Sequence, residues 1–198
     1  MNDDDVLEKY YDDFNTAMRA AEADFKENAP GLIPMLDAAA KATVLHRLIL
    51  RRVREAFSAH EEVRISRYRN LEVMYIPAPG DARVIFKKLT PNLRSRSYRT
   101  PQNKAFLLQQ TLKGFPPAAA NYIVGYTLNA LGTHIENTWA TKPNGEGVEW
   151  FRCLDDNAGQ EPLAVITPAT PPKGPMPTVR VRADKIIRFP EPKADSDA

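Results

Sequence analysis

The sequence has a single cysteine, Cys153, in 198 residues. One cysteine cannot form an internal disulfide, so the chain does not belong with the small secreted domains that disulfides hold together. No apolar run approaches the roughly 18 residues that a membrane-spanning helix needs. The acidic residues 1–14 also lack the basic and apolar regions of a secretory signal. We therefore expect a cytoplasmic protein without a membrane partner, in which Cys153 lies in the core of a strand.

The sequence also lacks the short motifs of several enzyme classes. It contains no GxSxG nucleophile elbow, no GxxxxGK(S/T) phosphate loop and no GxGxxG dinucleotide fingerprint. Its three histidines are widely spaced, and the zinc patterns HExxH and CxxC are missing. We expect no cofactor and no bound metal, and whether the chain is an enzyme stays open.

Carboxylates are missing from one long stretch, residues 82–135. This stretch holds eight lysines and arginines and no aspartate or glutamate, which gives a charge of +8 over 54 residues. Residues 1–28 have the opposite bias, with nine acidic and three basic residues. Separate blocks of charge usually mark surfaces for oppositely charged partners. The charge pattern thus predicts an anionic partner for the basic stretch.

The hydrophobic spacing changes from helical to strand-like along the chain. Apolar residues recur every three or four positions in 5–26 and 34–59, which predicts two helices. Thr100 and Pro101 have the character of a helix cap and a first helical residue, and predict a short helix over 101–111. Strands are expected in the β-rich runs 63–69, 71–76, 83–89, 121–129, 133–142 and 147–154, the first of which is either a strand or the approach to the next.

The expected fold class is α+β. A helical pair within 1–59 packs on a mostly antiparallel sheet of about five strands within 63–154, with one short inserted helix. Because 198 residues suit one well-buried core, we place both parts in a single domain, 1–158. The remaining residues, 159–198, are rich in proline and predict a largely extended tail.

The densest group of cations lies between residues 86 and 104, where lysine and arginine alternate with hydroxyl, amide and aromatic side chains. Arginine forks, hydroxyls and helix N-terminal amides bind phosphate oxygens, and a tyrosine can stack on a base. The pattern therefore predicts a site for nucleic acid or a nucleotide. Its candidate residues are Lys87, Lys88, Arg94, Arg96, Tyr98, Arg99 and Lys104. Two alternatives are a solvated loop and pairing of these cations with the acidic N-terminal helix or with a protein partner.

His134 and Glu136 are the candidate catalytic residues. Two positions apart on a strand, they are expected to project from the same face, which suits an acid/base pair in ribonuclease-like chemistry. Cations nearby would stabilise the charge on the phosphorus oxygens. The alternative is that both residues belong to the polar outer face of an amphipathic strand.

Several segments together resemble an uncharacterised family of bacterial and prophage-borne proteins. The matching residues fall in Phe86–Gln102, Gly114–Pro117 and Gly125–Thr133, and the resemblance covers about 71–154. Genes of that family often lie beside a helix-turn-helix regulator that carries a zinc-peptidase-like domain, as in toxin–antitoxin or phage-defence operons. The resemblance implies a cognate regulatory protein as partner, and it supplies no catalytic motif.

Three functional hypotheses follow. The first is a bacterial or phage-encoded accessory protein, toxin–antitoxin-like or phage-defence-like, that binds nucleic acid or an acidic partner through its basic loop. The second is a metal-independent nuclease or nucleotide-processing toxin. The third is a protein-interaction module that forms a homo-oligomer or binds a cognate protein.

Overall fold

The structure is a computed structural model that describes residues 3–28, 30–68, 71–77, 80–95, 100–115 and 117–155. Three predicted site residues, Arg96, Tyr98 and Arg99, lie outside the described residues, as does the predicted tail. None of the described helices combines the length and the apolar character needed to cross a membrane.

The N-terminal helical region begins with α1 (Asp3–Leu7) and continues into α2 (Tyr11–Asn28). A 3₁₀ turn over residues 8–10 separates them, where the apolar spacing had predicted one continuous helix. Both helices place their apolar residues in the same core, so the turn adjusts the path without moving the buried face.

The second predicted helix starts later than the sequence indicated, because α3 spans Ala38–Ala56. The Asp37 side chain accepts a hydrogen bond from the backbone N–H of Ala40 at 2.7 Å, which satisfies a free amide of the first turn and fixes the helix start there. The preceding residues, including Pro34, form a 3₁₀ turn instead.

Six strands form one sheet in the order β1-β2-β3-β4-β5-β6. All neighbours are antiparallel except β3 and β4, which are parallel. The mostly antiparallel α+β fold is thereby confirmed, with one strand more than the expected five. The strands are β1 (Arg64–Tyr68), β2 (Leu71–Ile76), β3 (Ala82–Lys88), β4 (Ala120–Leu128), β5 (Ile135–Asn144) and β6 (Gly147–Cys153).

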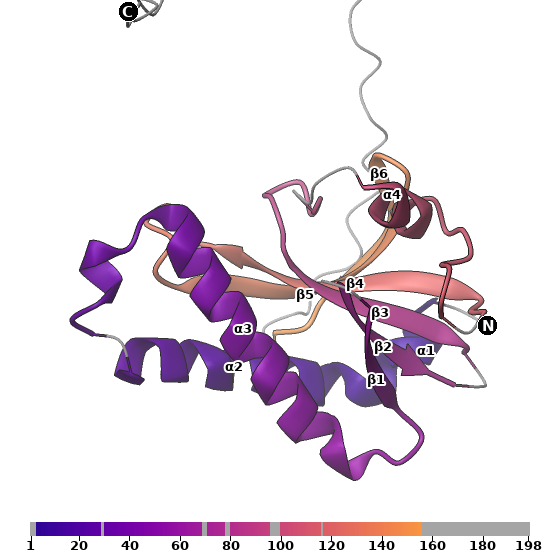
Figure 1. Cartoon of the computed structure of the whole chain (residues 1–198), viewed down its shortest axis with the longest axis horizontal. Coiled ribbons are helices and arrows are strands. Elements are labelled where there is room, and N and C mark those ends of the chain that lie inside the picture. Colours follow the sequence, from indigo (N-terminus) through magenta and orange to yellow (C-terminus); the bar gives the residue numbers. More distant parts are fainter. Residues whose placement is uncertain are drawn as a thin grey trace, which may run out of the picture. The chain divides into compact units, whose positions relative to one another are not determined.

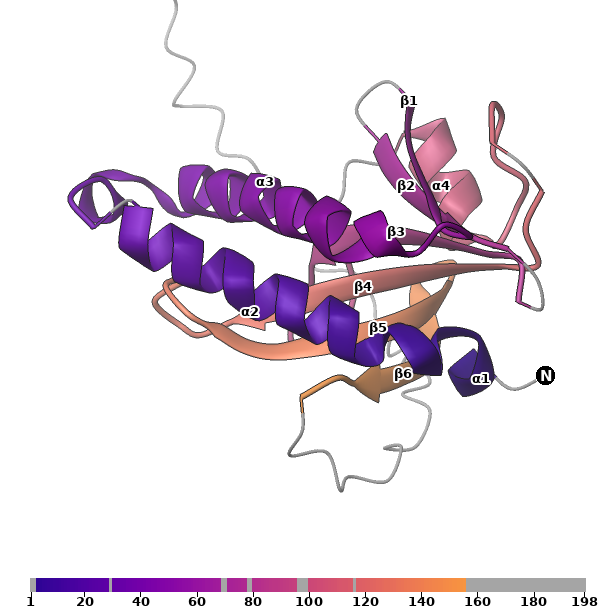
Figure 2. The ribbon, with the colours of Figure 1, turned by 90° about the horizontal axis from the view of Figure 1, so that it is seen from below.

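The sheet is covered on both faces (Figure 1). Helices α2 and α3 lie side by side on one face, and the short helix α4 (Pro101–Leu107) lies on the other. Figure 2 shows the helical pair from below, with α4 beyond the strands. Two hydrophobic clusters correspond to these layers. The larger joins α2 and α3 to the sheet through residues such as Phe14, Ile49 and Tyr126, and the smaller joins α4 to it through Ile85, Phe106 and Ile123.

The parallel pairing of β3 and β4 depends on α4, which connects them. The Asn121 side chain donates to the Phe106 carbonyl at 3.0 Å, and its backbone N–H donates to the Gln109 side chain at 2.7 Å, so the helix is fixed to β4. Farther along, a Cβ on Gly125 would lie 2.5 Å from the carbonyl oxygen of Lys87. Only glycine permits this close approach. As a result the carboxyl ends of β3 and β4 meet at one end of the sheet.

Candidate anion-binding cleft

A cleft of about 740 Å³ lies at the carboxyl ends of β3 and β4. Helix α3 contributes one wall, the ends of the two parallel strands another, and the start of β5 a third. Ligands of sheets that contain parallel strands often bind outside the carboxyl ends of those strands, because the chain diverges there. We name this space the anion-binding cleft; its polar lining comes mainly from Thr43, His46, Arg47, Lys87, Lys88, Thr90, Tyr126, Thr127, Glu136, Asn137 and Trp139.

Three cations of the cleft are not paired within the described part of the chain, although the carboxylate of Glu136 also lines it. Among the described residues, the side chains of Arg47, Lys87 and Lys88 make no ion pair or hydrogen bond, although other arginines of α3 are paired. Lys87 is half-buried, and burial lowers the pKa of its ammonium group. A charge held away from water without a partner is unfavourable, so this position favours an anion that enters the cleft.

His46 adds a neutral group to the same cleft. Burial, together with the nearby charges of Lys87 and Arg47, lowers the pKa of its imidazole to about 4. The ring is therefore uncharged near pH 7. In that state it offers one donor and one acceptor, and it does not neutralise an anion.

Two further polar groups on the cleft residues lack partners. The buried hydroxyl of Tyr126 and the buried indole N–H of Trp139 have no hydrogen-bond partner among the described residues. Burial also raises the pKa of the Tyr126 hydroxyl, so it stays protonated and can donate. Buried polar groups in proteins are nearly always hydrogen-bonded, so two unpartnered donors on residues of one cleft are unusual.

The structure divides the predicted anion site in two. Lys87 and Lys88 line the anion-binding cleft, whereas Arg94 and Lys104 line a second cavity of about 560 Å³ between α4 and the β5–β6 hairpin. The loop 89–95 separates them. One residue of the basic stretch, Arg83, is only 1% exposed and adds nothing to either surface.

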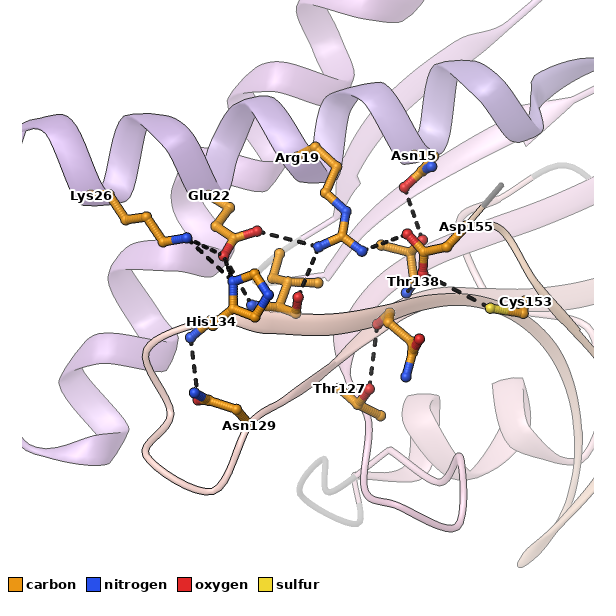
Figure 3. Close-up of polar contacts among 12 residues, drawn as sticks. Asn15, Arg19, Glu22, Lys26, Thr127, Asn129, His134, Thr138, Cys153 and Asp155 are labelled. Carbon is orange, nitrogen blue, oxygen red and sulfur yellow. Dashed lines mark hydrogen bonds and ion pairs between the residues drawn. The ribbon is translucent and has the colours of Figure 1, made fainter. Parts of the chain in front are cut away.

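His134 lies outside the anion-binding cleft, against α2 (Figure 3). Its Nδ1 is hydrogen-bonded to the Glu22 carboxylate, which also pairs with Lys26 at 2.7 Å and accepts from the backbone N–H of Ile135 at 3.1 Å. Burial opposes ionisation of Glu22, but the hydrogen bonds from Lys26 and Ile135 together with the nearby His134 keep its pKa below the ordinary value of 4.5. His134 therefore joins β5 to α2.

Glu136, in contrast, lines the anion-binding cleft. The two candidate catalytic residues thus have different surroundings, and the reason is a β-bulge. Leu128 pairs with Ile135 and Thr127 with Asn137, which leaves Glu136 as an extra residue. A bulge breaks the two-residue alternation on which the same-face expectation rested, and His134 precedes the first residue of β5, so alternation along a strand does not bring the two side chains together.

The acids of α2 do not neutralise the described predicted cations. Glu22 pairs with Arg19, Lys26 and His134, Asp24 with Arg52 of α3, and Asp13 with His60. None of the ion pairs between described residues joins α2 to Lys87, Lys88, Arg94 or Lys104. The acidic helix is used to hold α3 and β5 in place.

The contribution of α3 was missed in the sequence. Helical periodicity places Arg47, Arg51 and Arg54 together on the outer side of α3, but of the three only Arg51 and Arg54 meet carboxylates, Glu55 and Glu72. The sequence does distinguish these arginines. Arg51 has a glutamate four positions later, with which it can pair on a helix, whereas Arg47 has another arginine there. His46 carried no signal of its own.

Comparisons with protein-family models, curated proteins and solved structures gave no match to this chain. The described part of the chain also has no group of three or more histidine, cysteine, aspartate or glutamate side chains that could hold a metal ion. The arguments about function therefore rest on the cleft itself.

Proposed function

We propose that this chain binds nucleic acid through the anion-binding cleft. The observation that carries the proposal is the set of three cations, Arg47, Lys87 and Lys88, that have no partner among the described residues and lie beside the unpartnered donors of Tyr126 and Trp139. Phosphate oxygens would accept hydrogen bonds from both kinds of group.

The position of the remaining cations favours a polyanion over a single small anion. Arg94, which is part of the loop 89–95, and Lys104 line the second cavity and also have no side-chain partner among the described residues. Cations on both sides of one loop can follow successive phosphates of a strand. The resemblance to prophage-borne proteins is in keeping with a cytoplasmic accessory role in a toxin–antitoxin or phage-defence system, with a regulatory protein as second partner.

The test compares two variants of equal charge. Lys87→Gln/Lys88→Gln removes two cations from the cleft, and Arg64→Gln/Lys113→Gln removes two exposed cations that do not line it. Fluorescence anisotropy with a labelled 12-nucleotide RNA and DNA should show binding at least about tenfold weaker for the first variant and nearly unchanged for the second.

Salt dependence provides the second readout. Each phosphate contact contributes about −0.7 to the slope of log affinity against log salt for a single strand, so the Lys87/Lys88 variant should have the shallower slope. Equal loss in both variants would mean that only net charge matters. Absence of binding to any nucleic acid at low salt would overturn the proposal.

A second candidate function is RNA cleavage in the same cleft without a metal. The observation in its favour is that a neutral histidine, His46, lies beside two unpaired cations. His46 would accept the proton of a 2′-hydroxyl as that oxygen attacks the adjacent phosphorus. The P–O5′ bond then breaks and solvent protonates the leaving oxygen, while Lys87 and Arg47 stabilise the charge on the phosphorus oxygens.

The products would be a 2′,3′-cyclic phosphate and a 5′-hydroxyl. If the cleft cleaves RNA, His46→Asn should abolish cleavage of a labelled RNA in EDTA, and Glu136→Gln should reduce it if that carboxylate shares the role of base. His134→Gln is the control and should cleave normally. Loss of cleavage in the His134 variant alone would favour His134, as the sequence had suggested, over His46. If the wild type does not cleave RNA, this candidate function is wrong.

A further inference from the structure

The second cavity has a different chemistry from the anion-binding cleft. We propose that it is a base-binding pocket, and that it receives one unpaired base of a strand whose phosphates lie in the anion-binding cleft. The inference rests on the proposed function and sharpens it, because a ligand that donates an unpaired base is a single strand or a locally opened duplex.

The walls of the pocket are largely apolar. It occupies about 560 Å³ between α4 and the β5–β6 hairpin, and Leu107, Pro143 and Val148 line its sides. Ile123, which is 2% exposed, belongs to the sheet that forms its floor. The flat surface of a base favours apolar surroundings of this kind once the base leaves the stack, and burial of that surface is open to any base.

The pocket also offers groups for the edge of a base. Ser95, Asn103 and Glu146 line it together with the apolar residues. A hydroxyl, an amide and a carboxylate supply both donors and acceptors, which is what the polar edge of a base requires.

The rim carries the charge that the sugar-phosphate backbone needs. Arg94 and Lys104 line the pocket and are exposed, and no described side chain pairs with either. Their position at the mouth of an apolar cavity suits a ligand that is anionic outside and apolar inside. A nucleotide unit within a strand has that character.

The two cavities are adjoining spaces with a shared wall. Leu93 and Ser95 line both of them. The loop that carries these residues is closed by the backbone hydrogen bond from Thr90 N–H to the Arg94 carbonyl at 2.9 Å, and Leu93 within it has a positive φ of 56°. A strand that crosses this loop passes directly from one cavity into the other.

The pocket is also held open in advance. The Gly145 N–H donates to the Leu107 carbonyl at 2.8 Å, and the Gln109 side chain donates to the Pro143 carbonyl at 2.7 Å. These bonds fix the end of α4 to the β5–β6 hairpin. A preformed pocket lowers the entropic cost of binding, because its walls need not be ordered by the ligand.

The test measures the contribution of one base to affinity separately from that of the sugar-phosphate backbone. One probe is a five-nucleotide abasic DNA with a single central adenine, and the other is the same backbone with no base. The base should increase affinity by about tenfold, which is the size expected when part of its apolar surface leaves water for the pocket. A fully paired duplex of the same length should bind no better than the abasic backbone.

Two variants fill the pocket, Val148→Phe and Leu108→Trp, and Leu131→Trp adds the same bulk at an exposed site that does not line it. The filling variants should lose the gain from the base and keep the binding of the backbone, whereas Leu131→Trp should behave as wild type. Circular dichroism and thermal melting check that each variant is folded, and if the filling variants do not fold, the two probes on the wild type decide alone.

The outcomes distinguish the two proposals. If both probes bind the wild type equally, or if the filling variants still bind the adenine probe more tightly than the abasic one, the proposal of a base-binding pocket is wrong, while the proposal of nucleic-acid binding stands. If neither probe nor any longer nucleic acid binds at low salt, the proposed function itself falls. Weakening of both probes alike by Lys87→Gln/Lys88→Gln would support the division of labour between the cavities.

Discussion

Asp24 of α2 accepts two hydrogen bonds from the guanidinium of Arg52 of α3, at 2.6 Å from Nε and 2.5 Å from Nη2. The arrangement is the bidentate one that suits the planar guanidinium, and the hydrogen bonds from Arg52 lower the pKa of the Asp24 carboxyl. The pair binds the two helices to each other. Acids of α2 therefore serve the fold, which leaves the cations of the cleft available for a ligand.

The first prediction concerns this helix pairing. Asp24→Asn should lower the free energy of unfolding by about 1 kcal/mol, because one charge-assisted pair is lost from a buried carboxylate. Glu55→Gln is the control, since Glu55 is exposed and pairs with Arg51 and with the other side of Arg52 on its own helix, so its loss should cost much less than the loss of Asp24. Urea unfolding at neutral pH measures both. Equal stability of Asp24→Asn and wild type would contradict the structural role.

The second prediction concerns the stability of the fold at acidic pH. The folded pKa of Glu22 is below its ordinary value of 4.5, so its contribution to stability is present above pH 4.5 and is lost as the pH falls through the folded pKa. Glu22→Gln should cost about 2 kcal/mol at pH 7, because it removes the buried negative charge beside Lys26 and His134.

The stability difference between wild type and Glu22→Gln should then shrink below pH 4.5, as the wild-type carboxylate becomes protonated. Urea unfolding at a series of pH values follows it. A difference that stays constant down to pH 3 would show that the carboxylate charge is not what Glu22 contributes.

Much of the fold follows from local sequence patterns, and most of the site does not. Periodicity found α2 and α3, and the pair Thr100-Pro101 found α4, because these signals act within a few residues. The parallel pairing of β3 with β4 could not be predicted in the same way. It depends on how α4 packs, which is a contact between distant parts of the chain.

The site shows the same limit. Lys87 and Lys88 were found as a charge cluster, but nearness in sequence also assigned Arg94 to their group, and Arg94 lines the second cavity instead. His46 and Arg47 come from a helix about forty residues earlier, and only tertiary packing brings them in. The bulge at Glu136 likewise depends on pairing with β4 and cannot be read from alternation.

The third prediction concerns Gly125. A Cβ there would lie 2.5 Å from the Lys87 carbonyl oxygen and 2.6 Å from the Leu89 side chain, so Gly125→Ala forces β3 and β4 apart where they form the cleft. Overpacking of this kind costs about 1–3 kcal/mol. Gly31→Ala is a matched control, because nothing lies within 4 Å of its Cβ.

Thermal melting should separate the two alanine variants clearly, with the Gly31 variant close to wild type. The Gly125 variant should also bind nucleic acid more weakly than its stability alone explains, since the displaced strand carries Lys87 and Lys88. A variant with normal stability and normal binding would mean that the close approach of the strands is unnecessary.

The fourth prediction follows from His46. Its folded pKa of about 4 lies below the ordinary 6.5, so the unfolded chain takes up the proton first as the pH falls. Stability is therefore unaffected above pH 6.5 and decreases from there to about pH 4, by about 3 kcal/mol for a difference of this size. His46→Asn cannot titrate and should lack this part of the decrease, which urea unfolding between pH 7 and pH 4 would reveal.

A bound anion should raise the pKa of His46, whereas burial lowers it. A phosphodiester beside the ring favours the imidazolium and keeps its own charge throughout this range, so binding of the strand should tighten by about threefold to tenfold between pH 7 and pH 5. His46→Asn should bind equally at both values. Because Glu136 also lines the cleft, Glu136→Gln is the control, and it should retain the increase if His46 is the group that takes up the proton. If binding by the wild type does not change with pH, the phosphates lie away from His46 and so away from the wall of the cleft that α3 provides.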